Sequence, residues 1–211
     1  MQNKFHPEGG IKNIIFDLGG VILNIDYNLT SQAFKNLGLS DFDQTYSQTK
    51  QNHLFDKLET GEISEADFYT QMKTCFSNTI SENEIETAWN AMLLDLPEER
   101  INLLKKLSKN YRLFLLSNTN SIHFKAYSAY LKNTFGKMIF DDIFEKQYLS
   151  FEIGMRKPDK KIFEHVLNEN NLIPSETLFI DDSIQHIHGA NETGIITHHL
   201  KLPQTIIDVF R

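Results

Sequence analysis

Acidic and polar residues stand directly after three apolar stretches of this sequence. Asp17 follows IKNIIF, Ser117-Asn118 follow RLFLL, and Asp181-Asp182 follow TLFI. A short apolar run that stops at such residues is typical of a strand buried on both faces. Because parallel strands end at one edge of their sheet, we expect these five side chains to be neighbours although they are far apart in the sequence.

The chemistry open to this set is phosphoryl transfer. Carboxylates are ligands that Mg²⁺ prefers. One carboxylate can attack phosphorus to form an aspartyl-phosphate, while cations and a metal neutralise the charge of the transferring group. Lys157 precedes Pro158, where a helix is expected to begin, and it supplies a cation at the same edge.

Strands and helices alternate along most of the chain. Further strands are predicted at 144–149 and 194–199, and helices at 97–109, 158–170 and 184–193. Such alternation implies right-handed crossovers and a mostly parallel sheet with helices on both faces. The expected fold class is therefore α/β.

A helical module interrupts this alternation after the first strand. Ser64 and Ser81 each precede an acidic residue by three positions, which is typical of helix N-caps. The chain is predicted to consist of a core domain, residues 1–26 and 96–211, and an inserted helical domain, residues 27–95. Amphipathic helices are predicted in the insertion at 29–37, 51–58, 64–76 and 81–94.

Composition and charge narrow the class of partner. The chain of 211 residues has 40% hydrophobic and 23% charged residues, which is ordinary for a globular protein. Its formal net charge of −7 argues against general nucleic-acid binding but is compatible with one phosphorylated small molecule. No apolar run approaches the ~20 residues that span a bilayer, and the single Cys75 can form no intramolecular disulfide. We expect a cytoplasmic protein without membrane partners, as a monomer or weak homodimer.

Four short motifs follow one another at compatible spacings, and together they resemble the haloacid-dehalogenase-like (HAD) hydrolase superfamily. Subclass I of that superfamily carries a four-helix cap where this chain has its helical module. Within it, the chain is more closely similar to bacterial α-D-glucose-1-phosphate phosphatases. The resemblance implies a Rossmann-like parallel sheet core with an inserted α-helical cap, and a Mg²⁺-dependent phosphomonoesterase. The motifs are FDLGGVI at 16–22, LLSNTN at 115–120, GMRKPD at 154–159 and FIDDS at 179–183.

The resemblance also implies a role for each motif residue. Asp17 would be the nucleophile and a Mg²⁺ ligand, and the backbone carbonyl of Gly19 would be a second ligand. Asp182 would bind the metal directly, and Asp181 would bind it directly or through water. The cap would close over the leaving group, and the motifs assign no cap residue.

Three more motif residues would serve the phosphoryl group. Ser117 and the backbone amides near Asn118 would hold its oxygens. Lys157 would offset the negative charge and orient the nucleophile. These residues complete the expected catalytic and substrate-binding set.

One position departs from the pattern of the superfamily. Most of its phosphatases have a second aspartate two residues after the nucleophile, where this chain has Gly19. General acid–base help is worth roughly 10²–10⁴-fold, so its absence favours a leaving group that needs little protonation. A sugar 1-phosphate, such as a hexose 1-phosphate, leaves as a hemiacetal, whose anion is more stable than a simple alkoxide, so it needs the acid less. Asp26 is a possible substitute acid, and His186 stands where an acidic residue is usual.

Other interpretations of the same residues stay open. Each acidic or polar group, taken alone, could merely cap a turn or helix, and Lys157 alone could be a surface lysine. The pairs His186/His188 and His198/His199 lack the spacing of a helical zinc site. A metal-independent 2-haloacid dehalogenase and a catalytically weak binding or regulatory protein on the same scaffold are the two rival functions.

Overall fold

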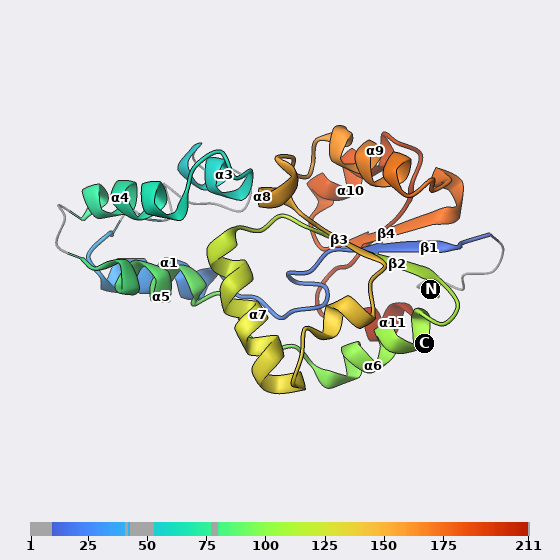
Figure 1. The fold of residues 1–211 in the computed structure, drawn as a ribbon, viewed down its shortest axis with the longest axis horizontal. Coiled ribbons are helices and arrows are strands. Elements are labelled where there is room, and N and C mark those ends of the chain that lie inside the picture. Colours follow the sequence, from blue (N-terminus) through green and yellow to red (C-terminus); the bar gives the residue numbers. More distant parts are fainter. Residues whose placement is uncertain (1–9, 41, 43–52, 77–79, 211) are drawn as a thin grey trace.

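One five-stranded parallel sheet forms the centre of the molecule (Figure 1). The computed structural model describes residues 10–40, 42, 53–76 and 80–210. Along the sheet the strands follow the order β3-β2-β1-β4-β5. The α/β prediction is confirmed, with strands β1 Asn13–Phe16, β2 Arg112–Ser117, β3 Lys146–Leu149, β4 Thr177–Asp181 and β5 Ile196–His199.

The central strand is buried on both faces because its apolar run leaves no polar side. In β1, Ile14 and Phe16 pack into the hydrophobic cluster on one face of the sheet. Ile15 packs into the cluster on the other face. Successive side chains of a strand point to opposite faces, so a continuous apolar run requires cover on both.

Helices supply that cover. The helices α9 Lys160–Glu169 and α10 Ile184–Asn191 lie on one face. On the other face lie α6 Glu98–Leu107, α7 Ser121–Phe135 and the short α11 Ile206–Val209 (Figure 1). Together they make a three-layer arrangement whose strand ends remain open toward the inserted helices.

The inserted helices pack on their own hydrophobic cluster, to one side of the sheet (Figure 1). Ser64 and Ser81 form capping boxes, as their spacing predicts. Trp89 lies at the centre of the cluster, stacked on Phe55 at 4.9 Å between ring centroids. Among the described residues of the insertion, the helices are α1 Tyr27–Asn36, α3 His53–Glu59, α4 Glu65–Cys75 and α5 Glu82–Asn90.

Several elements were not predicted from the sequence. The longest is α7, which begins after the N-cap Asn120 and ends at Gly136, whose φ of 74° suits a helix C-cap. The short segments α8 Ser150–Ile153, Ile139–Asp142 and Pro174–Glu176 were also not predicted. In the described ranges, no helix combines the length and apolar character that a membrane crossing requires.

Candidate active site

The sheet register brings the predicted acidic residues to one edge. Phe16, the last residue of β1, pairs with Leu115 of β2 and with Ile180 of β4. The next residue, Asp17, donates its backbone N–H to the carbonyl of Ile180 at 3.0 Å. Asp17 and Asp181 therefore leave adjacent strands at the same level.

Lys157 joins these two carboxylates. Its Nζ lies 2.6 Å from Asp17 Oδ1 and 2.7 Å from Asp181 Oδ2, and its side chain is completely buried. The interpretation of Lys157 as a surface lysine is thus wrong. A charged ammonium tolerates full burial only when anions and hydrogen bonds compensate it, and here two carboxylates do so.

Two further contacts fix the backbone around Lys157. The side-chain amide of Asn118 donates to the Lys157 carbonyl and accepts from its N–H, both at 2.9 Å. Gly189 of α10 lies so close that a Cβ there would be 2.0 Å from the carbonyl oxygen of Pro158. The β2 loop therefore holds the backbone of Lys157, and α10 lies directly against the next residue, Pro158.

A third carboxylate, that of Asp182, completes the cluster. One oxygen from each of Asp17, Asp181 and Asp182 lies within 4.8 Å of the others. Burial and the charges of Asp17 and Asp181 raise the pKa of Asp182 to about 7. Burial also raises the pKa of Asp17, an effect that Lys157 only partly offsets. The site holds more negative charge than Lys157 alone can balance.

The pKa values of Asp181 and Lys157 are shifted in the directions that favour an ion pair between them. Burial opposes the charge of Asp181, but Lys157 and His186 outweigh it and lower its pKa. Burial likewise opposes the charge of Lys157, and the two neighbouring carboxylates outweigh it and raise its pKa. His186 Nδ1 lies 3.0 Å from both carboxylate oxygens of Asp181.

The donor set fits a hard divalent cation. Three converging carboxylate oxygens with excess negative charge are what Mg²⁺ requires, since it binds oxygen ligands and neutralises carboxylates. Within the described part of the chain, this is the one group of three or more metal-ligating side chains, and it includes no histidine.

A narrow cavity of about 80 Å³ opens beside this cluster. Of the predicted residues, Asp17, Gly19, Asn118 and Asp182 line it. Ser117 is buried at the end of β2 and does not line it. From the helical module and α7, the cavity receives residues that the sequence did not single out, namely Tyr27, Glu59, Met92 and His123, and Arg156 of the GMRKPD motif joins them.

Arg156 connects the two sides of the cavity. Its guanidinium forms ion pairs with Asp56 and Glu59, both on α3 of the helical module. Glu59 is almost completely buried, with a relative exposure of 7%. Arg156 stands next to Lys157 in the motif, but no local signal in the sequence identifies Glu59 as its partner.

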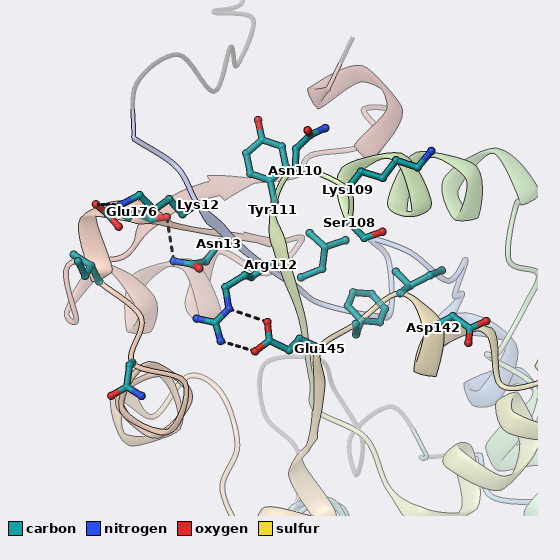
Figure 2. Close-up of a pocket in the computed structure, with 15 residues that line it drawn as sticks. Lys12, Asn13, Ser108, Lys109, Asn110, Tyr111, Arg112, Asp142, Glu145 and Glu176 are labelled. Atoms are coloured by element: carbon teal, nitrogen blue, oxygen red, sulfur yellow. Dashed lines mark hydrogen bonds and ion pairs between the residues drawn. The ribbon is translucent and has the colours of Figure 1, made fainter.

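A larger groove of about 720 Å³ lies at the opposite, amino-terminal edge of the sheet (Figure 2). Figure 2 shows Arg112, the first residue of β2, directed toward Glu145, and Lys12 directed toward Glu176. These charges are paired at 2.8 and 2.9 Å. The groove contains none of the motif residues, so the narrow cavity is the candidate active site.

Known proteins with similar sequences and structures support this choice. A D-ribitol-5-phosphate phosphatase of Bacteroides thetaiotaomicron is 35% identical over 187 residues, which cover 89% of this chain and 90% of that protein. A sesquiterpene phosphatase of Aspergillus oryzae is 26% identical over 192 residues, covering 90% of this chain and 89% of that protein. A wild-type HAD family enzyme of B. thetaiotaomicron, solved with magnesium and inorganic phosphate, matches with a TM-score of 0.85. It is 37% identical and covers 96% of this chain and 100% of its own.

The family assignment rests on nearly the whole chain. Residues 11–194 match the family described as haloacid dehalogenase-like hydrolase, and this range contains all four motifs and the helical module. The chain therefore belongs to the haloacid dehalogenase-like hydrolases, as its motifs predicted.

Proposed function

We propose that this protein is a Mg²⁺-dependent phosphatase that hydrolyses the phosphate ester of a small sugar or sugar alcohol through an aspartyl-phosphate at Asp17. One observation carries the proposal: the carboxylates of Asp17, Asp181 and Asp182 converge at the edge of a parallel sheet, and a completely buried lysine bridges the first two. A structural ion pair needs one carboxylate for each lysine, whereas this surplus of acids suits a divalent cation and a phosphoryl group.

Asp17, Asp181, Asp182 and the backbone carbonyl of Gly19 would hold the metal. When bound, Mg²⁺ supplies positive charge that offsets the crowded carboxylates and the phosphoryl oxygens. The magnesium in the similar B. thetaiotaomicron enzyme supports this part of the proposal.

Lys157 positions Asp17 for its attack on phosphorus. The ammonium holds Oδ1 at 2.6 Å, and Oδ2 has no hydrogen bond to any described residue, so it is available as the nucleophile. A bond forms between Oδ2 and phosphorus, and the bond from phosphorus to the ester oxygen breaks. The sugar or sugar alcohol leaves with a proton from solvent. Water then attacks phosphorus, the bond to Asp17 breaks, and inorganic phosphate is released.

The remaining predicted residues serve binding. The backbone amides near Asn118, which lines the narrow cavity, would hold phosphoryl oxygens during both steps, and Ser117, which is buried and does not line that cavity, stays a predicted second ligand. Residues 27–95 would act as the cap that closes over the leaving group held by the core of residues 1–26 and 96–211. Asp26 accepts a hydrogen bond from the Asn28 N–H as the N-cap of α1 and does not line the narrow cavity, so we assign it no acid role.

The lining of the cavity and the relatives support the proposed substrate class. Charged and polar side chains, among them Glu59, Arg156 and His123, face the space beside Asp17, and they suit a hydroxylated leaving group better than a hydrocarbon. The relative with the higher identity is named for D-ribitol 5-phosphate. A hexose 1-phosphate stays a prediction within this class.

The experiment is phosphate release from a panel of esters, in Mg²⁺ and in EDTA, for the wild type, Asp17→Asn and Asp26→Ser. The panel contains D-ribitol 5-phosphate, glucose 1-phosphate, glucose 6-phosphate and farnesyl phosphate. We expect release from a sugar or sugar-alcohol phosphate that needs both Mg²⁺ and Asp17. The Asp26→Ser control keeps the N-cap and should retain activity within about threefold.

Other results would replace the proposal. A preference for farnesyl phosphate would make the protein a phosphatase of a different substrate class. Metal-independent halide release from 2-chloropropionate would identify a dehalogenase. Mg²⁺ binding without turnover of any ester would identify a binding protein.

A further inference from the structure

We propose that His123 is a specificity-determining residue whose Nε2 atom accepts a hydrogen bond from a hydroxyl group of the leaving group. The inference deepens the proposed function and rests on it, because it names the group that recognises the sugar side of the ester. None of the four motifs assigns a role to His123.

His123 lies at the boundary between the helical module and the core. It belongs to the first turn of α7, directly after the β2 loop, and its side chain lines the narrow cavity together with Asp17. Its ring stacks on Trp89 of α5 at 5.0 Å between centroids, with 8° between the planes. The residue itself is 8% exposed, so its limited open surface faces a confined space.

Hydrogen bonds fix the orientation of the ring. Nδ1 lies 2.8 Å from Oδ1 of Asn90, the last residue of α5. The backbone N–H of His123 donates to Asn120 Oδ1 at 3.0 Å, and the Trp89 indole N–H donates to the same oxygen at 3.4 Å. The imidazole is thus held from the ring face, from Nδ1 and from its own backbone.

The other ring nitrogen is left for a ligand. Nε2 has no hydrogen-bond partner among the residues that the structure describes, and it is not among the fully enclosed polar atoms that lack one. Buried polar groups in folded proteins are nearly always hydrogen-bonded. An oriented imidazole nitrogen that has no protein partner, on a residue that lines the cavity, is available to bind a ligand.

Because Nε2 is a hydrogen-bond acceptor, it can bind a hydroxyl group of the leaving group but not the phosphate. Asn90 Oδ1 is an acceptor, so Nδ1 carries the proton and Nε2 presents a lone pair. Burial lowers the pKa of His123 to about 3, which keeps this neutral form at physiological pH. A phosphate dianion offers no proton and is repelled by the lone pair. A hydroxyl of the leaving group donates to it, whereas a hydrocarbon leaves it unsatisfied.

The test compares two kinds of ester in wild type and His123→Phe. Phenylalanine keeps the stacking on Trp89 and removes Nε2. For the best sugar or sugar-alcohol phosphate of the panel we expect kcat/KM to fall by about 5- to 100-fold, mainly through KM, because a buried hydroxyl loses its acceptor. For p-nitrophenyl phosphate, whose leaving group has no hydroxyl, we expect a change of less than about threefold. The matched control His188→Phe, an exposed position of α10, should alter neither.

Deoxy analogues of the best substrate identify the hydroxyl. Removal of the hydroxyl that Nε2 recognises should reduce kcat/KM in the wild type and have little effect in His123→Phe, so the two changes are not additive. If His123→Phe does not fold, His123→Leu takes its place in the same comparison.

The outcomes separate this inference from the proposed function. Equal losses on sugar phosphate and p-nitrophenyl phosphate, or additive effects for every deoxy analogue, would overturn the role of His123 while the phosphatase stands. Absence of turnover of all esters by the wild type would instead remove the proposed function itself.

Discussion

A Cβ atom on Gly20 would lie 2.3 Å from Oδ2 of Asp182, so the backbone after the nucleophile and the carboxylate after β4 are in direct contact. Gly20 also has a φ of +74°, a conformation that residues with a side chain rarely adopt. Gly20, the second glycine of FDLGGVI, is therefore needed to leave room for Asp182, which is distant in the sequence.

Gly20→Ala should weaken Mg²⁺ binding by roughly 10–100-fold, because the methyl group displaces the Asp182 carboxylate. Gly136→Ala is the matched control, since Gly136 has the same φ of +74° and no heavy atom within 4 Å of an added Cβ. Both variants carry the same backbone strain, and only Gly20→Ala should lose affinity in isothermal titration calorimetry. Equal Mg²⁺ affinities would show that the contact is unimportant for the metal.

Lys157→Met should destabilise the metal-free protein by about 3–5 kcal/mol, because it leaves buried carboxylates without their cation. Urea unfolding in EDTA measures the change in the free energy of unfolding. Lys161→Met, at an exposed position of α9, should stay within about 0.5 kcal/mol of the wild type. A Lys157→Met protein as stable as the wild type would mean that the carboxylates take up protons instead.

Asp182→Asn should increase the stability of the metal-free protein and reduce the stabilisation that Mg²⁺ provides. Burial and the neighbouring carboxylates raise the pKa of Asp182 to about 7, so its charge is unfavourable in the folded state at pH 8. In EDTA at pH 8 the variant should gain about 1–3 kcal/mol of stability. Saturating Mg²⁺ should raise the melting temperature of the wild type more than that of the variant.

An exposed aspartate provides the control for that reversal. Asp141→Asn removes a carboxylate that accepts from Gln147 Nε2 at 2.8 Å, a bond that asparagine can also make. It should change neither the stability in EDTA nor the response to Mg²⁺. An Asp182→Asn protein that is less stable than the wild type in EDTA would count against electrostatic crowding at the site.

His123 should make stability depend on pH in a defined window. Its imidazole protonates near pH 6.5 in the unfolded chain and only near pH 3 in the folded protein, so the unfolded state binds more protons between these values. Stability is therefore lost as the pH falls below 6.5. Between pH 7 and pH 5 the wild type should lose about 2 kcal/mol more than His123→Phe.

The measurement is the free energy of unfolding of both proteins at pH 7 and pH 5. His188→Phe should keep the full dependence of the wild type, because His188 is exposed. Identical pH dependence in His123→Phe and the wild type would show that the ring takes up a proton without unfolding.

Much of the fold can be predicted from local sequence. The apolar runs of β1, β2 and β4 predict buried strands, because a strand without a polar face must be covered on both sides. The capping serines of α4 and α5 act within one helical turn, so their spacing alone is informative. By contrast the sequence predicts no bounds for α7, because this helix contains polar residues on several sides.

The candidate active site likewise has one part that the sequence predicts and another that it does not. The residue types and their places at strand ends predicted that Asp17, Asp181 and Asp182 would meet, because parallel strands share one carboxyl edge, and the sequence by itself determined this much. Only the tertiary structure decided that Lys157 is buried between two of these acids and that His123 faces the cavity. Both outcomes depend on partners from distant elements, Asp17 for the lysine and Trp89 and Asn90 for the histidine. No local pattern encodes such contacts, because burial and orientation are set by how the layers pack.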